Sequence, residues 1–184
     1  MVTTGAPREL IAAPHPVLTA RALPVDPTDP LVVAAAADLL ATMRRVRRCV
    51  GLAAPQIGVG WRLLSFDVSS HPRARSCAGE LVVANPHLVA ASRWEPGREG
   101  CLSVPGLVAD VLRATRITVR GESPGTGAPV VVDADALEAR CIQHQLDHLD
   151  GVLFMDRVIG ARAAHRTGSG PAGERTTAGD FSDY

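Results

Sequence analysis

Residues 141–148 read Cys141-Ile142-Gln143-His144-Gln145-Leu146-Asp147-His148. Side chains four residues apart lie on one face of an α-helix, so the imidazoles of His144 and His148 can bind a single cation. In the H-E-x-x-H motif of metal-binding helices, the Glu that follows the first His serves as the general base. This chain has Gln145 there, whose amide can hydrogen-bond but cannot take a proton. The stretch predicts a metal-binding helix without its usual proton shuttle.

A third ligand is offered by Cys101, in the segment Glu99–Pro105. The chain has six His, so two of them can lie four residues apart by chance, and the pair alone is weak evidence for a metal site. A thiolate with two imidazoles, however, makes a site with three protein ligands and an open position, which is typical of catalytic metal centres. The alternative for Cys101 is an unrelated buried cysteine.

The segment Gly51–Gln56 combines small residues, which allow close backbone approach, with a Gln amide. The Gln56 amide could donate a hydrogen bond to a developing oxygen anion. Taken alone, the segment is also compatible with an ordinary loop.

Composition favours one globular domain and argues against a nucleic-acid-binding protein. The 184 residues are 46% hydrophobic, and nineteen basic residues, all Arg, balance nineteen acidic ones. Nucleic-acid binding needs a concentrated positive surface, which a net charge of zero does not favour. The local cluster Arg44, Arg45, Arg47 and Arg48 is interpreted as the basic last turn of a helix, with a transient RNA or ribosome contact as the alternative.

The cysteine pattern predicts a reducing cytoplasm as the location. Four cysteines occur without a C-x-x-C pair, and the first ten residues have no signal-peptide pattern. The longest apolar run, Leu31–Ala37, is much shorter than the roughly 20 residues of a membrane span. We therefore expect no membrane association.

Periodicity and turn residues predict the other elements. Asp29 as cap and Pro30 as first residue begin a helix that should end near Arg48. The further expectations, in chain order, are an extended or strand segment at 8–13, a half-buried strand at 64–68, a loop at 69–79, a strand at 80–84, and a hairpin joining strands near 117–119 and 130–132.

The metal-binding helix should begin at Asp133 or Asp135 and end at Asp150, with Gly151 as the residue that stops it. Asp135 and Glu138 could form a capping box. Strands first and this helix late indicate an α+β domain over residues 1–160. Residues 161–184 are rich in Gly, Ser, Thr and charge, so a disordered tail is expected.

Three segments together resemble the peptide deformylase family, whose motifs read G-x-G-L-A-A-P-Q, E-G-C-L-S-V-P and Q-H-E-x-D-H-L-x-G. Here they appear in the same order as Cys49–Gln56, Glu99–Pro105 and Gln143–Gly151, followed by Leu153-Phe154-Met155-Asp156. The resemblance covers roughly Leu10 to Val158.

The resemblance implies antiparallel β-sheets packed around a central helix and removal of the formyl group from the N-terminal methionine of new polypeptides. It implies one divalent metal ion, typically Fe(II), with Zn, Ni or Co as substitutes, held by Cys101, His144 and His148. The Gln56 side chain and the Leu102 backbone N–H would hold the oxyanion. The substrate pocket would be formed by Val50, Gly51, Glu99, Gly100, Cys141 and His144. Formyl-methionyl peptides are the expected partners, and the chain is expected to be a monomer or a weak dimer.

Three departures from the family pattern stand out: Gln145 for the catalytic Glu, Cys49 for a Gly, and the apolar run Gly106-Leu107-Val108 after the second motif. General acid–base assistance contributes roughly 10²–10⁴ in rate, so reduced turnover is expected. Asp147 is expected to orient Arg113 or a ligand imidazole. The alternatives are a binding module without catalysis and an enzyme that acts on a formyl or amide group of a small molecule.

Overall fold

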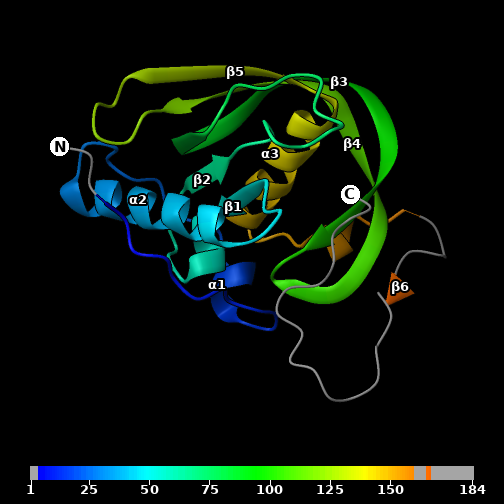
Figure 1. The fold of residues 1–184 in the computed structure, drawn as a ribbon, viewed down its shortest axis with the longest axis horizontal. Helices are drawn as coiled ribbons and strands as arrows, with labels where there is room; N and C mark the ends of the chain where they lie inside the picture. The colour runs from blue at the N-terminus through cyan, green and yellow to red at the C-terminus, as the bar shows by residue number, and fades with distance from the viewer. Residues whose placement is uncertain (1–3, 160–164, 167–184) are drawn as a thin grey trace.

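The computed structural model describes residues 4–159 and 165–166 of the chain. Its elements are α1 (Pro16–Thr19), α2 (Pro30–Arg45), β1 (Gly51–Ala53), η1 (Ala54–Ile57), β2 (Leu63–Phe66), β3 (Leu81–Cys101), β4 (Val104–Glu122), β5 (Pro129–Asp135), α3 (Ala136–Leu149), η2 (Phe154–Arg157) and β6 (His165–Arg166). Most of the elements are strands, and α3 is the helix that carries the two histidines (Figure 1).

The strands form one antiparallel sheet in the order β1-β2-β3-β4-β5, with β6 paired to β4. The sheet is strongly curved, and α3 lies inside the curve while α2 lies on the outer flank (Figure 1). The predicted α+β class with antiparallel strands around the motif helix is confirmed. The strands belong to a single continuous sheet in the part of the chain that is described.

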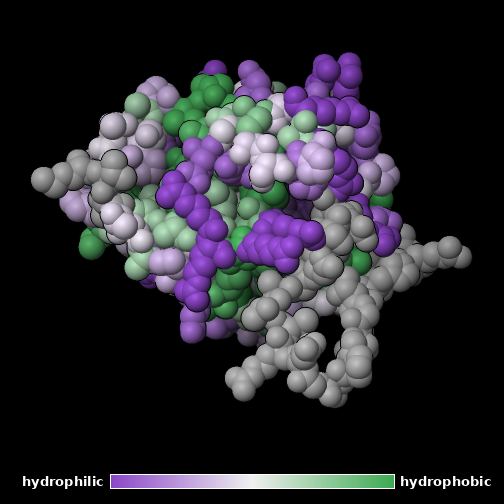
Figure 2. Space-filling view, viewed as in Figure 1, coloured by the Kyte–Doolittle hydropathy of each residue, from purple (hydrophilic) through white to green (hydrophobic). Residues whose placement is uncertain are grey.

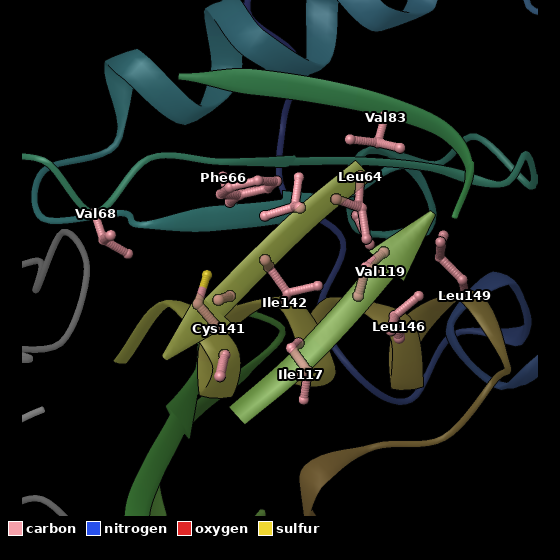
Figure 3. Packing of buried hydrophobic residues seen from close by; sticks show 14 of the residues in the cluster. Leu64, Phe66, Val68, Val83, Ile117, Val119, Cys141, Ile142, Leu146 and Leu149 are labelled. Atoms are coloured by element: carbon pink, nitrogen blue, oxygen red, sulfur yellow. The ribbon is translucent and has the colours of Figure 1, made fainter. Parts of the chain in front are cut away.

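The apolar side of α3 lies in one of three hydrophobic clusters in the described part of the chain, and the buried side of α2 lies in a second. Ile142 and Leu149 are fully buried and pack against the inner face of β2, which includes Leu64 and Phe66. Figure 3 shows these side chains from α3 meeting those of β2, β3 and β4. Burial of each such side chain stabilises the fold by roughly 1.5–3 kcal/mol. This packing fixes the height and rotation of α3, and therefore the position of the polar residues on its other side.

The start of α3 differs from prediction. Asp133 belongs to β5, and Asp135 is the N-cap but makes no capping hydrogen bond with its side chain. The predicted capping box is wrong because the Glu138 carboxylate is engaged elsewhere: it accepts hydrogen bonds from Ser76 Oγ at 2.5 Å and from Ala78 N at 2.7 Å. Glu138 therefore ties the loop before β3 to the helix.

The first long helix, α2, begins as predicted. Its cap is Asp29, whose carboxylate accepts the Leu31 N–H at 2.8 Å, and Pro30 is its first residue. It ends at Arg45 rather than near Arg48, and Arg48 has a left-handed φ of 60°. Half of the basic cluster thus lies beyond the helix end and not in its last turn.

The predicted strands are all present, but two are much longer than the sequence indicated. Residues 80–84 are the beginning of β3, which continues to Cys101, and residues 117–119 lie near the end of β4. The strand at 64–68 is β2, and it is buried on both faces rather than one. Residues 69–79 form the predicted loop, and 8–13 belong to no strand, although the Ile11 and Ala13 N–H groups donate to the Gln56 and Ser103 carbonyls.

None of the described helices is long and apolar enough to span a membrane. Hydrophilic and hydrophobic residues are interspersed on the face that Figure 2 shows. The expected disorder of 161–184 falls outside the described residues, apart from the backbone of 165–166, which pairs with Leu107 and Val108 of β4. The domain limit at residue 160 stays a prediction.

Gly151 confirms the predicted end of α3, with a left-handed φ of 73°. A Cβ atom here would lie 2.6 Å from the Thr19 carbonyl oxygen. We expect Gly151→Ala to destabilise the fold by about 1–3 kcal/mol and to lower the melting temperature by ~2–10 °C. The matched control is Gly60→Ala, because a Cβ at Gly60 meets no atom within 4 Å. Equal melting temperatures of the two variants would contradict this view of the helix end.

Candidate metal centre

Cys101, His144 and His148 converge in the interior. Cys101 is the last residue of β3, and the two histidines are one helical turn apart on α3. All three are buried, and their ligand atoms lie within 4.8 Å of one another. Cys101 Sγ is 3.2 Å from His148 Nε2. The structure therefore brings together the three residues that the sequence predicted as metal ligands.

Glu99 fixes the orientation of His144. Its Oε2 lies 3.0 Å from His144 Nδ1, and the same carboxylate receives two hydrogen bonds from Arg113, each 2.9 Å, and one from Arg140, 2.8 Å. A carboxylate on Nδ1 leaves Nε2 of the ring directed to the metal position, and such contacts tune the ligand. The Glu99 carboxylate is thus a support for His144.

Arg113 also contacts Asp147, the residue before His148 on α3. It is 3% exposed and donates to Asp147 Oδ2 at 2.5 Å, while Arg157 donates to the same oxygen at 2.7 Å. The prediction that Asp147 contacts Arg113 is confirmed. The imidazole of His144 is oriented by Glu99 and not by Asp147. The Asp147 carboxylate thus connects α3 to β4 through the buried Arg113 and to η2 through the half-exposed Arg157.

The electrostatics of the site favour the thiolate form of Cys101. Burial raises the pKa of the thiol, but the hydrogen bonds and charges of His144 and His148 lower it more, to about 5. Burial also lowers the pKa of His144, but Cys101 and Glu99 raise it to about 10. The pKa of Glu99 lies below its usual range, because hydrogen bonds and charge from His144 and Arg113 exceed the effect of burial.

The donor set fits a divalent transition metal. A thiolate and two imidazoles suit zinc, iron and neighbouring ions, and three protein ligands leave a position open. Among the described residues, Gln145 Oε1 and His148 Nδ1 are the buried side-chain N or O atoms that have no hydrogen-bond partner, and both residues belong to α3.

Gln56 points its amide nitrogen into the site. Its Oε1 accepts the Ala53 N–H at 3.0 Å, which fixes the amide so that Nε2 lies 3.2 Å from Ser103 Oγ and 3.7 Å from Cys101 Sγ. Leu102 directly follows the thiolate and packs with the cluster around α2. Both predicted oxyanion donors therefore come from segments that adjoin Cys101.

The wall between α3 and β1 is tightly packed at Gly51. A Cβ there would lie 2.6 Å from Cys141 Sγ and 3.3 Å from Gln145 Cγ. Cys141 Sγ donates to the Val50 carbonyl at 3.2 Å, and Cys49 Sγ donates to the Gly51 carbonyl at 3.3 Å. The predicted pocket residues Val50, Gly51 and Cys141 therefore lie side by side, and Gly100 adjoins Cys101 on β3.

This packing predicts that Gly51→Ala disturbs the wall. The added methyl group would contact Cys141 Sγ and the Ser65 carbonyl oxygen, 3.2 Å away. Overpacking typically destabilises by about 1–3 kcal/mol. Thermal unfolding of Gly51→Ala, Cys141→Ala and the double variant measures the coupling, and we expect Cys141→Ala to recover part of the loss. Strictly additive effects would show that the contact is not the cause.

Sequence reasoning missed several supporting residues. Arg140 precedes His144 by one helical turn, a spacing that could have placed its side chain beside Glu99. Ser103 lies within the second motif and contacts Gln56. Arg157 follows α3 and gave no sequence signal for its contact with Asp147.

A buried Cys–His–His cluster between the end of β3 and the central helix of an antiparallel α+β fold is typical of the metallohydrolase class. Residues 7–164 match the sequence model of the family described as polypeptide deformylase. The chain belongs to the peptide deformylase family.

Individual proteins that resemble this chain in sequence or structure are also peptide deformylases. The chain is 43% identical over 143 residues to a peptide deformylase from Acidothermus cellulolyticus, covering 78% of this chain and 74% of that protein. It is 37% identical over 161 residues to one from Symbiobacterium thermophilum, covering 87% and 70%. Among solved structures, a peptide deformylase from Legionella pneumophila superposes with a TM-score of 0.74 at 36% identity, covering 84% of this chain and 87% of that one. One from Synechococcus elongatus in complex with actinonin has the same score and identity, covering 85% and 81%.

Proposed function

We propose that this chain is a metal-dependent deformylase that hydrolyses the formyl group from the N-terminal methionine of new polypeptides. The observation that carries the proposal is the buried Cys101–His144–His148 cluster, with ligand atoms within 4.8 Å. The chain's membership of the peptide deformylase family supplies the reaction and the substrate class.

We propose that Cys101, His144 and His148 hold Fe(II), with Zn, Ni or Co as substitutes. Bound there, a divalent ion would supply Lewis-acid chemistry and make water acidic enough to act near neutral pH. The chain's own residues hold the site in shape: Glu99 fixes His144 through Nδ1, and Arg113 and Arg140 hold Glu99.

We propose that the Gln56 amide and the Leu102 backbone N–H stabilise the negative charge that develops on the formyl oxygen. The hydrogen bond from Ala53 N to Gln56 Oε1 supports this role, because it directs the donor end of the amide toward Cys101. Preorganised donors of this kind contribute about 2.7–4 kcal/mol each to transition-state stabilisation in other hydrolases.

The methionine side chain is proposed to lie against Val50, Gly51, Gly100, Cys141 and His144. The close packing of Cys141 against the segment 50–51 supports one continuous apolar wall there. Glu99 was expected in this pocket as well, but its contacts with Arg113, Arg140 and His144 favour a supporting role.

Gln145 is proposed to limit turnover. It occupies the position of the family's general base, is 5% exposed and lies on the same face of α3 as the pocket. A neutral amide cannot deliver a proton to the leaving amine, so the rate is expected to fall by roughly 10²–10⁴. The unpartnered Oε1 also favours the second candidate function, a module that binds formylated ligands without cleaving them.

Formate release tests the proposal and separates the two candidates. Purified protein loaded with Fe(II) or Ni(II) is incubated with formyl-Met-Ala, and formate is quantified over time. Slow release that stops when a chelator removes the metal supports the deformylase. Acetyl-Met-Ala is the control substrate. No formate with any metal, together with micromolar binding of formyl-Met-Ala, would instead support the binding module.

The cytoplasm is the proposed location, because all four cysteines are free thiols. We propose no stable macromolecular partner beyond the formylated polypeptide and, at most, a transient contact with the ribosome.

A further inference from the structure

The N-terminal segment contacts both of the segments that carry the proposed oxyanion donors. The Ile11 N–H donates to the Gln56 carbonyl at 2.8 Å, and the Ala13 N–H donates to the Ser103 carbonyl at 2.8 Å. Gln56 carries the proposed side-chain donor, and Ser103 directly follows Leu102, which carries the proposed backbone donor. Two neighbouring N–H groups thus connect two segments that are 47 residues apart in the chain.

The two donors lie in short elements that depend on contacts from outside. Gln56 belongs to η1, which has four residues, and Leu102 and Ser103 form the tight turn between β3 and β4. A side-chain hydrogen bond of 3.2 Å, from Gln56 Nε2 to Ser103 Oγ, joins the two elements directly. Because such short pieces have few internal hydrogen bonds of good geometry, the contacts around them decide their relative position.

The segment that makes these contacts is anchored to two helices. On one side, the Arg8 guanidinium donates to Asp38 of α2 at 2.8 Å. On the other side, the Ala22 N–H donates to the carbonyl of Leu149, the last residue of α3, at 2.8 Å. Figure 1 shows this N-terminal strap (residues 8–22, in blue) passing along α2 and on to α1. The strap is therefore held at both ends and can support what it contacts in between.

The two hydrogen bonds are separable from the packing that holds the strap in the domain. Leu18 of α1 is fully buried, whereas Ile11 and Ala13 are partly buried. Apolar burial is the dominant stabilising contribution in folding, so Leu18 contributes more to the attachment of the strap than the two partly buried residues do. The N–H groups of Ile11 and Ala13 can therefore be removed without detaching the strap.

We propose that the N–H groups of Ile11 and Ala13 are positioning groups that set the distance between the two oxyanion donors. They act through the Gln56 and Ser103 carbonyls and do not touch the substrate. The proposal rests on the proposed function for the role of the donors. Preorganised donors act only when they are aimed at the place where charge develops, so their displacement should lower kcat more than it raises KM.

Amide-to-ester replacements test this role, because an ester deletes one backbone N–H and keeps the side chain. Esters at positions 11 and 13 each delete one of the two bonded N–H groups. The ester at position 12 is the matched control, because Ala12 is exposed and its N–H has no hydrogen-bond partner among residues 4–159 and 165–166. Positions 12 and 13 are both alanine, so these two esters are chemically identical.

Solvent exchange of side-chain amide protons measures the support directly. The chain has three Gln, at positions 56, 143 and 145, so ¹⁵N-glutamine labelling of the zinc-loaded protein gives three side-chain amide groups. The signal that is missing in Gln56→Glu belongs to Gln56. Gln143 is the internal control, because its buried amide donates to the Ala114 carbonyl at 2.7 Å and reports the general stability of the fold.

We expect the esters at positions 11 and 13 to raise the exchange rate of the Gln56 amide about 3- to 10-fold, because each removes one hydrogen bond that opposes local opening. The Gln143 rate should stay within about 2-fold of wild type, and the ester at position 12 should leave both rates within about 2-fold. Ala13→Pro and Ala12→Pro delete the same N–H groups genetically and should show the same contrast. In a formate assay, the esters at 11 and 13 should lower kcat about 3- to 10-fold with KM within about 2-fold.

An unchanged Gln56 rate in the esters at 11 and 13 would overturn the proposal. So would an equal rise in the ester at 12, or a rise that Gln143 shares, because both indicate general loss of stability. The exchange result is independent of turnover. Faster Gln56 exchange without formate release from any of the proteins rejects the deformylase function and keeps the positioning role, whereas formate release with unchanged Gln56 exchange does the reverse.

Discussion

The variant Gln145→Glu is expected to release formate from formyl-Met-Ala about 10²–10⁴ times faster than the wild-type chain, which corresponds to about 3–5 kcal/mol of barrier. Glu and Gln have nearly the same shape, so the tight wall at Gly51 should accommodate the change. The carboxylate adds what the amide lacks, a group that can take a proton and return it to the leaving amine. The measurement is kcat/KM at equal metal content.

Two controls accompany this prediction. Gln145→Ala removes the amide without adding a carboxylate, and it should give no increase in rate. Metal content and melting temperature establish that each variant is folded and loaded. A Glu variant that carries the full metal content and remains as slow as wild type would show that proton transfer at position 145 does not limit this protein.

The variant Cys101→Ser is expected to lose the metal ion and, with it, formate release. Even residues that only support metal ligands contribute about 10–100-fold to metal affinity, so removal of a ligand should cost more than about 100-fold. Burial makes the loss more severe, because Cys101 is 3% exposed and a serine hydroxyl there is not ionised.

Elemental analysis after gel filtration measures this effect. The matched control is Cys77→Ser, because Cys77 is a free and exposed cysteine. We expect about one metal ion per chain in the control and less than about a tenth in Cys101→Ser. Full metal content in Cys101→Ser would place the ion elsewhere.

The motif helix could be predicted because its signals are local. One short segment contains the two histidines four residues apart, the apolar residues of the helix and Gly151 at its end. The structure confirms the helix and its end at this glycine. The capping box failed for a long-range reason. Glu138 is held by Ser76 and Ala78, some sixty residues earlier, and no local pattern reports such a contact.

The length of β3 could not be predicted for a different reason. Half-buried strands reveal themselves by alternation, but residues 87–96 are exposed on both faces and therefore show none. The residues Asn85 and Arg93 also have left-handed φ values of 50° and 59°, which interrupt the regular pattern. Pairing with β4 along this region, and not its own composition, makes it a strand.

The three candidate metal ligands could be predicted from the sequence, but the residues that hold them in place could not. Cys101 and the two histidines are residue types that identify themselves by chemistry and spacing. The role of Glu99 depends on where β3 ends relative to α3, and on Arg113 of β4 and Arg140 of α3, which meet it in space. The orientation of Gln56 was within reach, because its partner Ala53 is three residues away.

X-ray absorption spectroscopy of the metal-loaded wild-type chain identifies the atoms bound to the ion. We expect one sulfur ligand from Cys101 and two imidazole nitrogens from His144 and His148, with the sulfur lost in Cys101→Ser and kept in Cys77→Ser. A first shell without sulfur, or one unchanged in Cys101→Ser, would contradict this assignment.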